Sequence, residues 1–228
     1  RLGIKMLQNP MEPGFPGAPV PAGQDGKFSA EELLGVIWNN RAWYAEQFLP
    51  ELLERCVTIG SMSVNGLDLS PWCQALQGWD GLYNRNSVGA HIFRVFMANY
   101  INELDTDLTM PFNPADPVGT PAEPSQENAG TASDTMLQAL ANGVSALQSQ
   151  GIAPTEQLGD LQYYRASGGV VPGSAGMPVF QTQPIPWHGG DGNIDGAFNA
   201  TGVVTSEFAE DTRFPRIAPE VIDNTAGL

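Results

Sequence analysis

Apolar residues recur every three or four positions through the first two thirds of the chain, the spacing of helices with one buried face. Ser29, followed by Glu31 and Glu32, has the composition of a helix start, because serine caps a first turn and acidic side chains favour its dipole. Pro50 is expected to bend or restart this helix, giving two helices or one kinked helix. The predicted helical face carries Leu34, Ile37, Trp38, Arg41, Ala42, Ala45, Phe48 and Leu49.

Three further helices are predicted downstream. Ser70 and Pro71 fit an N-cap and a first helical residue, ahead of a short buried helix. A T-x-x-D capping sequence that starts at Thr131 precedes a helix expected to stop at Gly151. Ser87 is expected to cap the clearest helix of the chain, which carries Val88, Ile92, Val95, Phe96, Asn99 and Tyr100.

These patterns divide the chain into three parts. Residues 1–27 are predicted to hold the end of a helix and a linker rich in proline and glycine. Residues 28–151 are predicted to form a helical subdomain with a long surface loop at 105–130. Residues 152–228 are predicted to be a loop-rich segment with short strands, truncated before the rest of a core. The fold class is therefore mainly α with irregular loops, and short extended pieces are expected at 170–171, 179–181 and 201–205.

The charge balance excludes some classes of partner. Lys and Arg total 10 against 25 Asp and Glu, and a net charge of −15 repels the phosphates of nucleic acid. No apolar run approaches the roughly 18 residues of a membrane span, so no transmembrane helix is expected. Only 15% of the residues are charged, with 26 Gly and 19 Pro, which indicates long irregular loops of the kind that suit secreted proteins.

Two cysteines, Cys56 and Cys73, lie 17 positions apart, one closing a predicted helix and one inside the next. A disulfide between them would join the two helices, contribute roughly 3 kcal/mol for a loop of about 15 residues, and need an oxidising compartment. The alternative is a pair of buried thiols. Zinc is disfavoured because a site needs three or four ligands and both His91 and His188 are far away in the sequence. No cofactor is predicted, although structural calcium in a longer parent protein stays open.

Residues with catalytic or binding potential are few. A nucleophilic serine is expected in a G-x-S-x-G or S-x-x-K context, and Ser174, the nearest approach, is interpreted as part of a turn. His188 stands among glycines and acids, where it acts as a base or, more often, hydrogen-bonds a loop together. His91 is interpreted as a packing residue at the edge of the core. Six aromatic residues could line an acyl pocket, but their helical spacing favours core packing: Trp38, Trp43, Trp72, Trp79, Phe93 and Phe96.

One stretch resembles a calcium-binding loop in part. Asp191, Asn193, Asp195 and Gly196 match positions 1, 3, 5 and 6 of an EF-hand loop, where alternate oxygens around a glycine turn wrap a hard cation. Position 12 falls on Gly202, although a bidentate glutamate is needed there. A structural turn is therefore the preferred interpretation, and no metal ligand and no catalytic residue is assigned.

Four stretches follow one another along the chain: FSAEELLGVIWNNRAWYAEQFLPELLERC, CQALQGWDGLYNRNSVGAHIFRVF, LGDLQYY and IPWHGGDGNIDGAFNA. They resemble the later part of the β-chain of the penicillin acylase family, with its L-P-x-L-L, L-x-x-W-D-G, S-x-x-A-x-x-F, L-G-D-x-Q and H-G-G-x-G segments in the same order. The resemblance covers roughly residues 1–200. The two cysteines point to the acyl-homoserine-lactone and aculeacin A acylase branch of that family.

The resemblance implies a parent enzyme with the α+β, αββα fold of N-terminal-nucleophile hydrolases. Such a precursor is cut into α- and β-chains, and the new N-terminal serine uses its own α-amino group as base to cleave an amide. Because this chain starts at Arg1, which receives no role, it is expected to be an inactive internal piece of the β-chain whose partners are the remaining segments. The parent is expected to be periplasmic or secreted and to hydrolyse an N-acyl-homoserine lactone, lipopeptide or penicillin side chain. The alternative is a non-catalytic helical binding or scaffold module.

Overall fold

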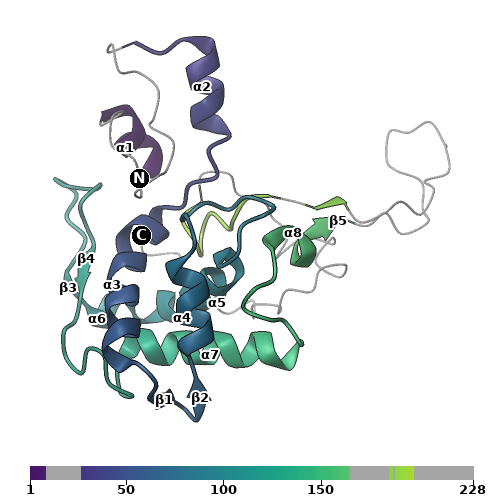
Figure 1. Ribbon diagram of the computed structural model, residues 1–228. Helices are drawn as coiled ribbons and strands as arrows, with labels where there is room; N and C mark the ends of the chain where they lie inside the picture. Colours follow the sequence, from purple (N-terminus) through teal and green to yellow (C-terminus); the bar gives the residue numbers. More distant parts are fainter. Residues whose placement is uncertain (9–26, 165–184, 187, 198–228) are drawn as a thin grey trace.

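The computed structural model describes residues 1–8, 27–164, 185–186 and 188–197, which are mainly helical (Figure 1). Its helices are α1 (Leu2–Gln8), α2 (Ala30–Ile37), α3 (Trp43–Ile59), α4 (Ser70–Gln77), α5 (Ala90–Tyr100), the 3-10 helix η1 (Ile101–Glu103), α6 (Leu104–Asp107), α7 (Thr135–Ser149) and α8 (Leu158–Leu161). The described strands pair antiparallel as β1 (Ser63–Val64) with β2 (Leu67–Asp68), β3 (Leu108–Met110) with β4 (Ala122–Pro124), and β5 (Tyr163–Tyr164) with β6 (Ile185–Pro186). The predicted mainly helical character is confirmed. None of the described helices combines the length and the apolar character needed to cross a membrane.

Helix α5 lies inside the helical body, alongside α7 and next to α3 and α4 (Figure 1). Its side chains from Ala90 to Ala98 are all buried, so this stretch of the helix has no solvent-exposed face. Gly143 of α7 faces α5, and a Cβ added there would lie 2.8 Å from the carbonyl oxygen of Val95. The missing side chain at Gly143 therefore lets the two helices approach closely, and α5 becomes the frame on which the loops of the chain are placed.

The long N-terminal helix predicted from the sequence breaks at a different position. Helix α2 ends at Ile37 and α3 begins at Trp43, whereas Pro50 lies within α3 at an exposed position. Between the helices Asn40 has a φ of 54°, and its carbonyl accepts a hydrogen bond from the Tyr83 amide at 2.9 Å. The helix does not restart at Pro50, and a bend there stays a prediction. The break lies earlier because backbone pairing with a distant loop, which no local pattern contains, separates α2 from α3.

The start of α2 agrees with the prediction and the start of α4 agrees in part. The Ser29 hydroxyl accepts a hydrogen bond from the Glu32 amide at 3.2 Å, and the Glu32 carboxylate accepts one from the Ser29 amide at 2.7 Å. In α4, Pro71 lies in the first turn, but as the second helical residue and not the first. Ser70 is the first helical residue and Leu69 the N-cap, so the predicted serine cap is wrong at this helix.

The predicted caps of α5 and α7 are each replaced by a residue closer to the helix. Helix α5 begins after Gly89, while the Ser87 hydroxyl donates to the Leu82 carbonyl at 2.8 Å and so stabilises the preceding loop. Helix α7 is capped by Asp134, whose carboxylate accepts from two backbone amides of the first turn, and not by Thr131. In both cases a side chain that could cap the helix is used by a turn instead.

The predicted surface loop at residues 105–130 contains regular structure. Strands β3 and β4 pair within it, with Leu108 opposite Pro124 and Met110 opposite Ala122. A pairing of three residues in each strand is too short to give a visible alternation in the sequence. The extended pieces predicted at 170–171, 179–181 and 201–205 lie outside the described residues.

A disulfide joins α3 to α4 through Cys56 and Cys73, whose Cα atoms are 5.8 Å apart. The sequence was compatible with either a disulfide or a pair of buried thiols, and the structure contains the disulfide. The bond links two helices that pack together and closes a loop with a sequence separation of 17. It therefore fixes the segment holding β1 and β2 against the helical body.

Reduction of this disulfide is expected to lower the free energy of unfolding by about 3 kcal/mol, because the reduced chain regains the conformational entropy of the closed loop. Urea denaturation with and without dithiothreitol measures the difference. A variant with both Cys56→Ala and Cys73→Ala serves as control, because dithiothreitol should leave its midpoint unchanged. Equal midpoints for the oxidised and reduced wild type would contradict the expected contribution.

Candidate functional site

The segments that carry the four sequence motifs meet in space although they are far apart in the chain. Backbone hydrogen bonds join them: the Gly189 amide donates to the Tyr83 carbonyl at 2.9 Å, and the Gly159 amide donates to the Arg85 carbonyl at 2.7 Å. The Tyr83 amide in turn bonds to Asn40, as described above. We call this assembly the motif junction; it consists of residues 39–44, 79–87, 158–162 and 188–197.

Arg94 of α5 is the centre of the motif junction, and only 1% of its side chain is exposed. Its Nε donates to Oδ2 of Asp195 at 3.1 Å, one terminal nitrogen to Oε1 of Gln162 at 2.7 Å, and the other to the Gly189 carbonyl at 3.3 Å. The guanidinium carbon also lies 5.5 Å from the centre of the Tyr83 ring. One buried cation therefore contacts three of the four motif segments.

Asp195 is the counter-charge of Arg94 and is fully buried. Its Oδ2 also accepts a hydrogen bond from the Asp191 amide at 2.8 Å. Burial raises the pKa of Asp195 above its ordinary value, and the positive charge of Arg94 acts in the opposite direction. The pair is thus a desolvated ion pair, in which each charge depends on the other.

Two carboxylate oxygens of the calcium-like sequence, Oδ1 of Asp191 and Oδ2 of Asp195, accept hydrogen bonds from the backbone of their own turn. Oδ1 of Asp191 accepts from the amides of Asn193 and Ile194 at 2.8 and 3.0 Å. Gly190 has no room for a side chain, because a Cβ there would lie 2.9 Å from Oδ2 of Asp195. These contacts agree with the structural turn that the sequence favoured. Among the described residues no cluster of three or more His, Cys, Asp or Glu is placed to hold a metal ion.

His188 precedes this turn and is half-buried. Its ring centre lies 6.2 Å from that of Trp38, with an angle of 40° between the two planes. Trp38 is 60% exposed, so its predicted place on a buried helical face is wrong: α2 ends beside it and carries it away from the core. Whether His188 serves as a base or only as a loop residue stays a hypothesis.

His91, on α5, is a packing residue as predicted, although it is fully buried instead of lying at the edge of the core. Its Nε2 lies 3.2 Å from the carbonyl oxygen of Ala153. Burial lowers the pKa of His91 to about 4, which the carbonyl contact and the nearby Glu156 oppose. The ring is therefore neutral at pH 7 and donates its Nε2 hydrogen to the carbonyl.

The buried His91 is expected to make folding sensitive to mild acid. Its pKa is about 4 in the folded chain and 6.5 in the reference state, so the unfolded chain binds the extra proton first. Its stabilising effect is complete above pH 6.5 and lost as the pH falls toward 4, by about 2 kcal/mol at pH 5. We expect urea denaturation at pH 7.5 and 5 to show a smaller pH dependence for His91→Gln than for the wild type. Equal slopes would contradict this, because the carboxylates titrate in both proteins.

The remaining candidates are five aromatic residues, Ser174 and Arg1. Trp43, Trp72, Trp79, Phe93 and Phe96 are buried and form core contacts, as predicted; the ring centres of Trp79 and Phe93, and those of Phe93 and Phe96, are 5.4 Å apart. Ser174 lies outside the described residues. Arg1, which received no role, places its guanidinium 5.0 Å from the ring centre of Phe112.

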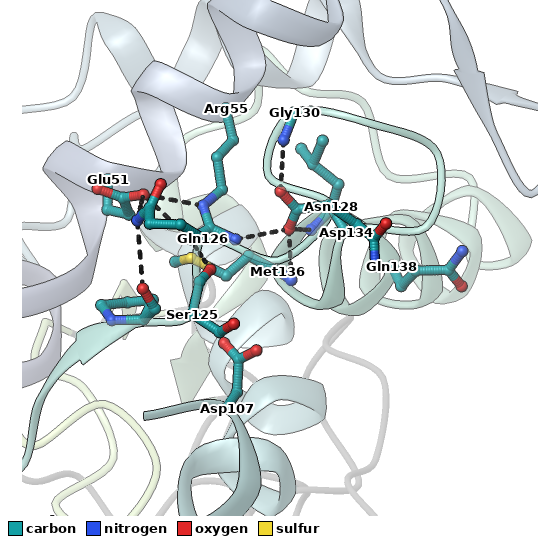
Figure 2. A network of polar contacts seen from close by, with 12 residues as sticks. Glu51, Arg55, Asp107, Ser125, Gln126, Asn128, Gly130, Asp134, Met136 and Gln138 are labelled. Atoms are coloured by element: carbon teal, nitrogen blue, oxygen red, sulfur yellow. Dashed lines mark hydrogen bonds and ion pairs between the residues drawn. The ribbon is translucent and has the colours of Figure 1, made fainter. Parts of the chain in front are cut away.

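A second buried cation, Arg55 of α3, connects α3 to the start of α7 (Figure 2). It donates to Oδ1 of Asp134 at 2.9 Å, to the carbonyl of Ser125 at 2.7 Å and to Oε1 of Glu51 at 3.0 Å. Asp134 is fully buried and also accepts from the Gly130 amide at 2.6 Å. Figure 2 shows these groups converging from α3, the loop after β4 and the cap of α7. The network fixes that loop between two helices.

Sequence reasoning missed both buried arginines as central residues. The available signal was an arginine between apolar residues of a strong helical pattern: Arg94 in FRVF and Arg55 in LLERC. An arginine that faces a core needs buried acceptors, so it predicts an ion pair even when the partner cannot be identified. Chemically, both networks hold segments together, because each arginine bonds to acceptors from at least two different segments of the chain.

Comparison with known proteins shows which family this chain resembles. The family model described as penicillin amidase matches residues 20–218. The chain is 30% identical over 185 residues to the acyl-homoserine lactone acylase PvdQ of Pseudomonas savastanoi pv. phaseolicola (strain 1448A / Race 6), covering 81% of this chain and 21% of that protein. It is 30% identical over 221 residues to the aculeacin-A acylase of Actinoplanes utahensis, covering 95% of this chain and 24% of that protein. This chain therefore spans about a fifth to a quarter of the length of these curated relatives.

Proposed function

Because this chain belongs to the penicillin amidase family, we propose that it is an internal segment of the β-chain of an acylase precursor and forms a helical subdomain of that enzyme. The observation that carries the proposal is the extent of the family match, which includes all segments of the motif junction. The relatives named above are acylases, and the stretch they share with this chain is a minor part of their length.

The reaction that we propose for the parent enzyme is hydrolysis of an acyl amide: an N-acyl-homoserine lactone, a lipopeptide or a penicillin side chain. The nucleophile is an N-terminal serine in another segment, with its own α-amino group as base. In this proposal the isolated chain is inactive, because the nucleophile and its base belong to another segment.

The motif junction has a positioning role in this proposal. Arg94 holds the H-G-G turn and the L-G-D-x-Q segment against α5, so the surface built from these loops has one arrangement. The other α- and β-chain segments complete the αββα fold around this surface. A periplasmic or secreted location is supported by the Cys56 to Cys73 disulfide, since such bonds persist in oxidising compartments.

Activity measurements on two proteins test the proposal. The 228-residue chain and the full precursor from which it derives are purified and assayed with an N-acyl-homoserine lactone, an acylated lipopeptide and a penicillin. We expect the precursor to hydrolyse at least one of these amides and the isolated chain to hydrolyse none. Turnover by the isolated chain at the rate of the precursor would place the chemistry in this segment. A folded precursor without activity on any of them would favour the non-catalytic binding or scaffold module.

A further inference from the structure

Arg41, between α2 and α3, is a buried cation whose hydrogen bonds are incomplete. Only 3% of its side chain is exposed, and its Nε donates to Oε1 of Glu46 at 2.6 Å. Both terminal nitrogens are shielded from solvent and have no hydrogen-bond partner within the part of the chain that the structure describes. A guanidinium has five N–H donors, so four of them lack an acceptor here. This contrasts with Arg55 and Arg94, each of which bonds to several acceptors.

The backbone around Arg41 is held firmly, so its unpaired nitrogens do not result from a loose loop. Residue 41 forms an antiparallel bridge with Leu82, and its amide donates to Oδ1 of Asn39 at 3.0 Å. The neighbouring Ala42 forms a bridge with Ala197. The backbone of Arg41 is thus held at the motif junction and the Nε of its side chain bonds to Glu46, while both terminal nitrogens have no acceptor among the residues that the structure describes.

The helix that leads into Arg41 presents an apolar surface. Leu33, Leu34 and Trp38 are 41%, 55% and 60% exposed, and Figure 1 shows α2 standing away from α3, α4, α5 and α7. Exposed apolar side chains gathered on one short helix are typical of an interface. The unpaired donor fork and the apolar helix lie within nine residues of each other in the sequence.

We propose that this face binds another segment of the acylase precursor, and that an Asp or Glu carboxylate of that segment pairs with the terminal nitrogens of Arg41. The planar fork of a guanidinium matches the two oxygens of a carboxylate, and burial makes that geometry more favourable than a single point contact. The inference rests on the proposed function, since the partner comes from the precursor length that this chain does not cover.

The terminal nitrogens of Arg41 are covered by protein atoms in the chain alone, so the incoming carboxylate has to displace the atoms over them.

Zero-length crosslinking of the full precursor tests the pairing. In the Arg41→Lys variant a water-soluble carbodiimide joins the new amine to any carboxylate in direct contact, and peptide mass spectrometry identifies the partner. We expect a crosslink from Lys at position 41 to an Asp or Glu outside residues 1–228. In the control variant Arg85→Lys we expect at most a trace of such a crosslink from position 85, because Arg85 is exposed. Crosslinks only to Glu46, or only to carboxylates of residues 1–228 in the same or another copy, would overturn the proposal.

An experimental structure of the unmodified precursor gives a second test that does not depend on the variant folding. A carboxylate oxygen from outside residues 1–228 within about 3.2 Å of a terminal nitrogen of Arg41 is the expected result. An active, processed precursor in which those nitrogens face only water, a small ion or atoms of residues 1–228 would overturn this inference and leave the proposed function standing. A precursor without amide hydrolysis would instead remove the proposed function.

Discussion

Replacing Arg94 with methionine is expected to lower the free energy of unfolding by about 3–5 kcal/mol. The change leaves Asp195 buried and charged without its partner, and it removes donors from Gln162 and the Gly189 carbonyl. Methionine fills a similar volume, so the loss reports mainly on the missing charge and hydrogen bonds. Urea denaturation of the purified chain measures the effect.

A double-mutant cycle separates the ion pair from simple packing. Asp195→Leu alone is expected to destabilise the chain, because it leaves the Arg94 charge buried without the carboxylate that pairs with it. The double variant with Arg94→Met and Asp195→Leu leaves neither charge behind, and it should be more stable than the sum of the two single changes predicts. Strict additivity would contradict the description of Arg94 and Asp195 as a coupled pair.

Replacing Arg55 with methionine is expected to cost a similar amount, about 3–5 kcal/mol, for a different reason. Asp134 keeps its backbone donors, but its buried charge loses the only cation that contacts it in the described part of the chain. The Ser125 carbonyl loses its donor at the same time, so the loop after β4 is released from α3. Urea denaturation gives the total loss, and hydrogen exchange of the Gly130 amide reports on the loop itself.

Arg85→Met is the matched control for both arginine variants. Arg85 is exposed, and a change at such a position is expected to alter stability by less than about 0.5 kcal/mol. Asp134→Asn adds a second comparison, because asparagine can still cap α7 but no longer carries the charge that pairs with Arg55. If Arg55→Met were as mild as Arg85→Met, the buried network of Figure 2 would not stabilise the fold.

The helical pattern predicted where elements occur more reliably than where they begin. The strong apolar period over α5 and α7 corresponds to faces that are buried against each other, so local sequence and packing agree there. The start of α5 was misplaced because Ser87 stabilises the preceding loop, and the end of α2 was misplaced because Asn40 pairs with Tyr83. Both errors come from contacts between segments, which a local pattern does not contain.

At the candidate site, too, local sequence features were predicted and contacts between distant segments were not. The resemblance of four stretches identified the family, and the family comparison confirms the family. It did not predict that the motifs converge on Arg94, because Arg94 and Asp195 are 101 positions apart. The glycines and acids after His188 favoured a structural turn, which the contacts of Asp191 support. The sequence analysis did not identify Arg94 as the cation that bonds to this turn.

The proposal that this chain is part of a processed acylase is tested most directly on the full precursor exported to the periplasm. N-terminal sequencing and intact-mass analysis under non-reducing conditions are made on the purified protein. The predicted result is a cleaved precursor with a new N-terminal serine upstream of Arg1 and two fewer hydrogens in the peptides that contain Cys56 and Cys73. An uncut precursor with free thiols would contradict the account and favour a scaffold or binding module.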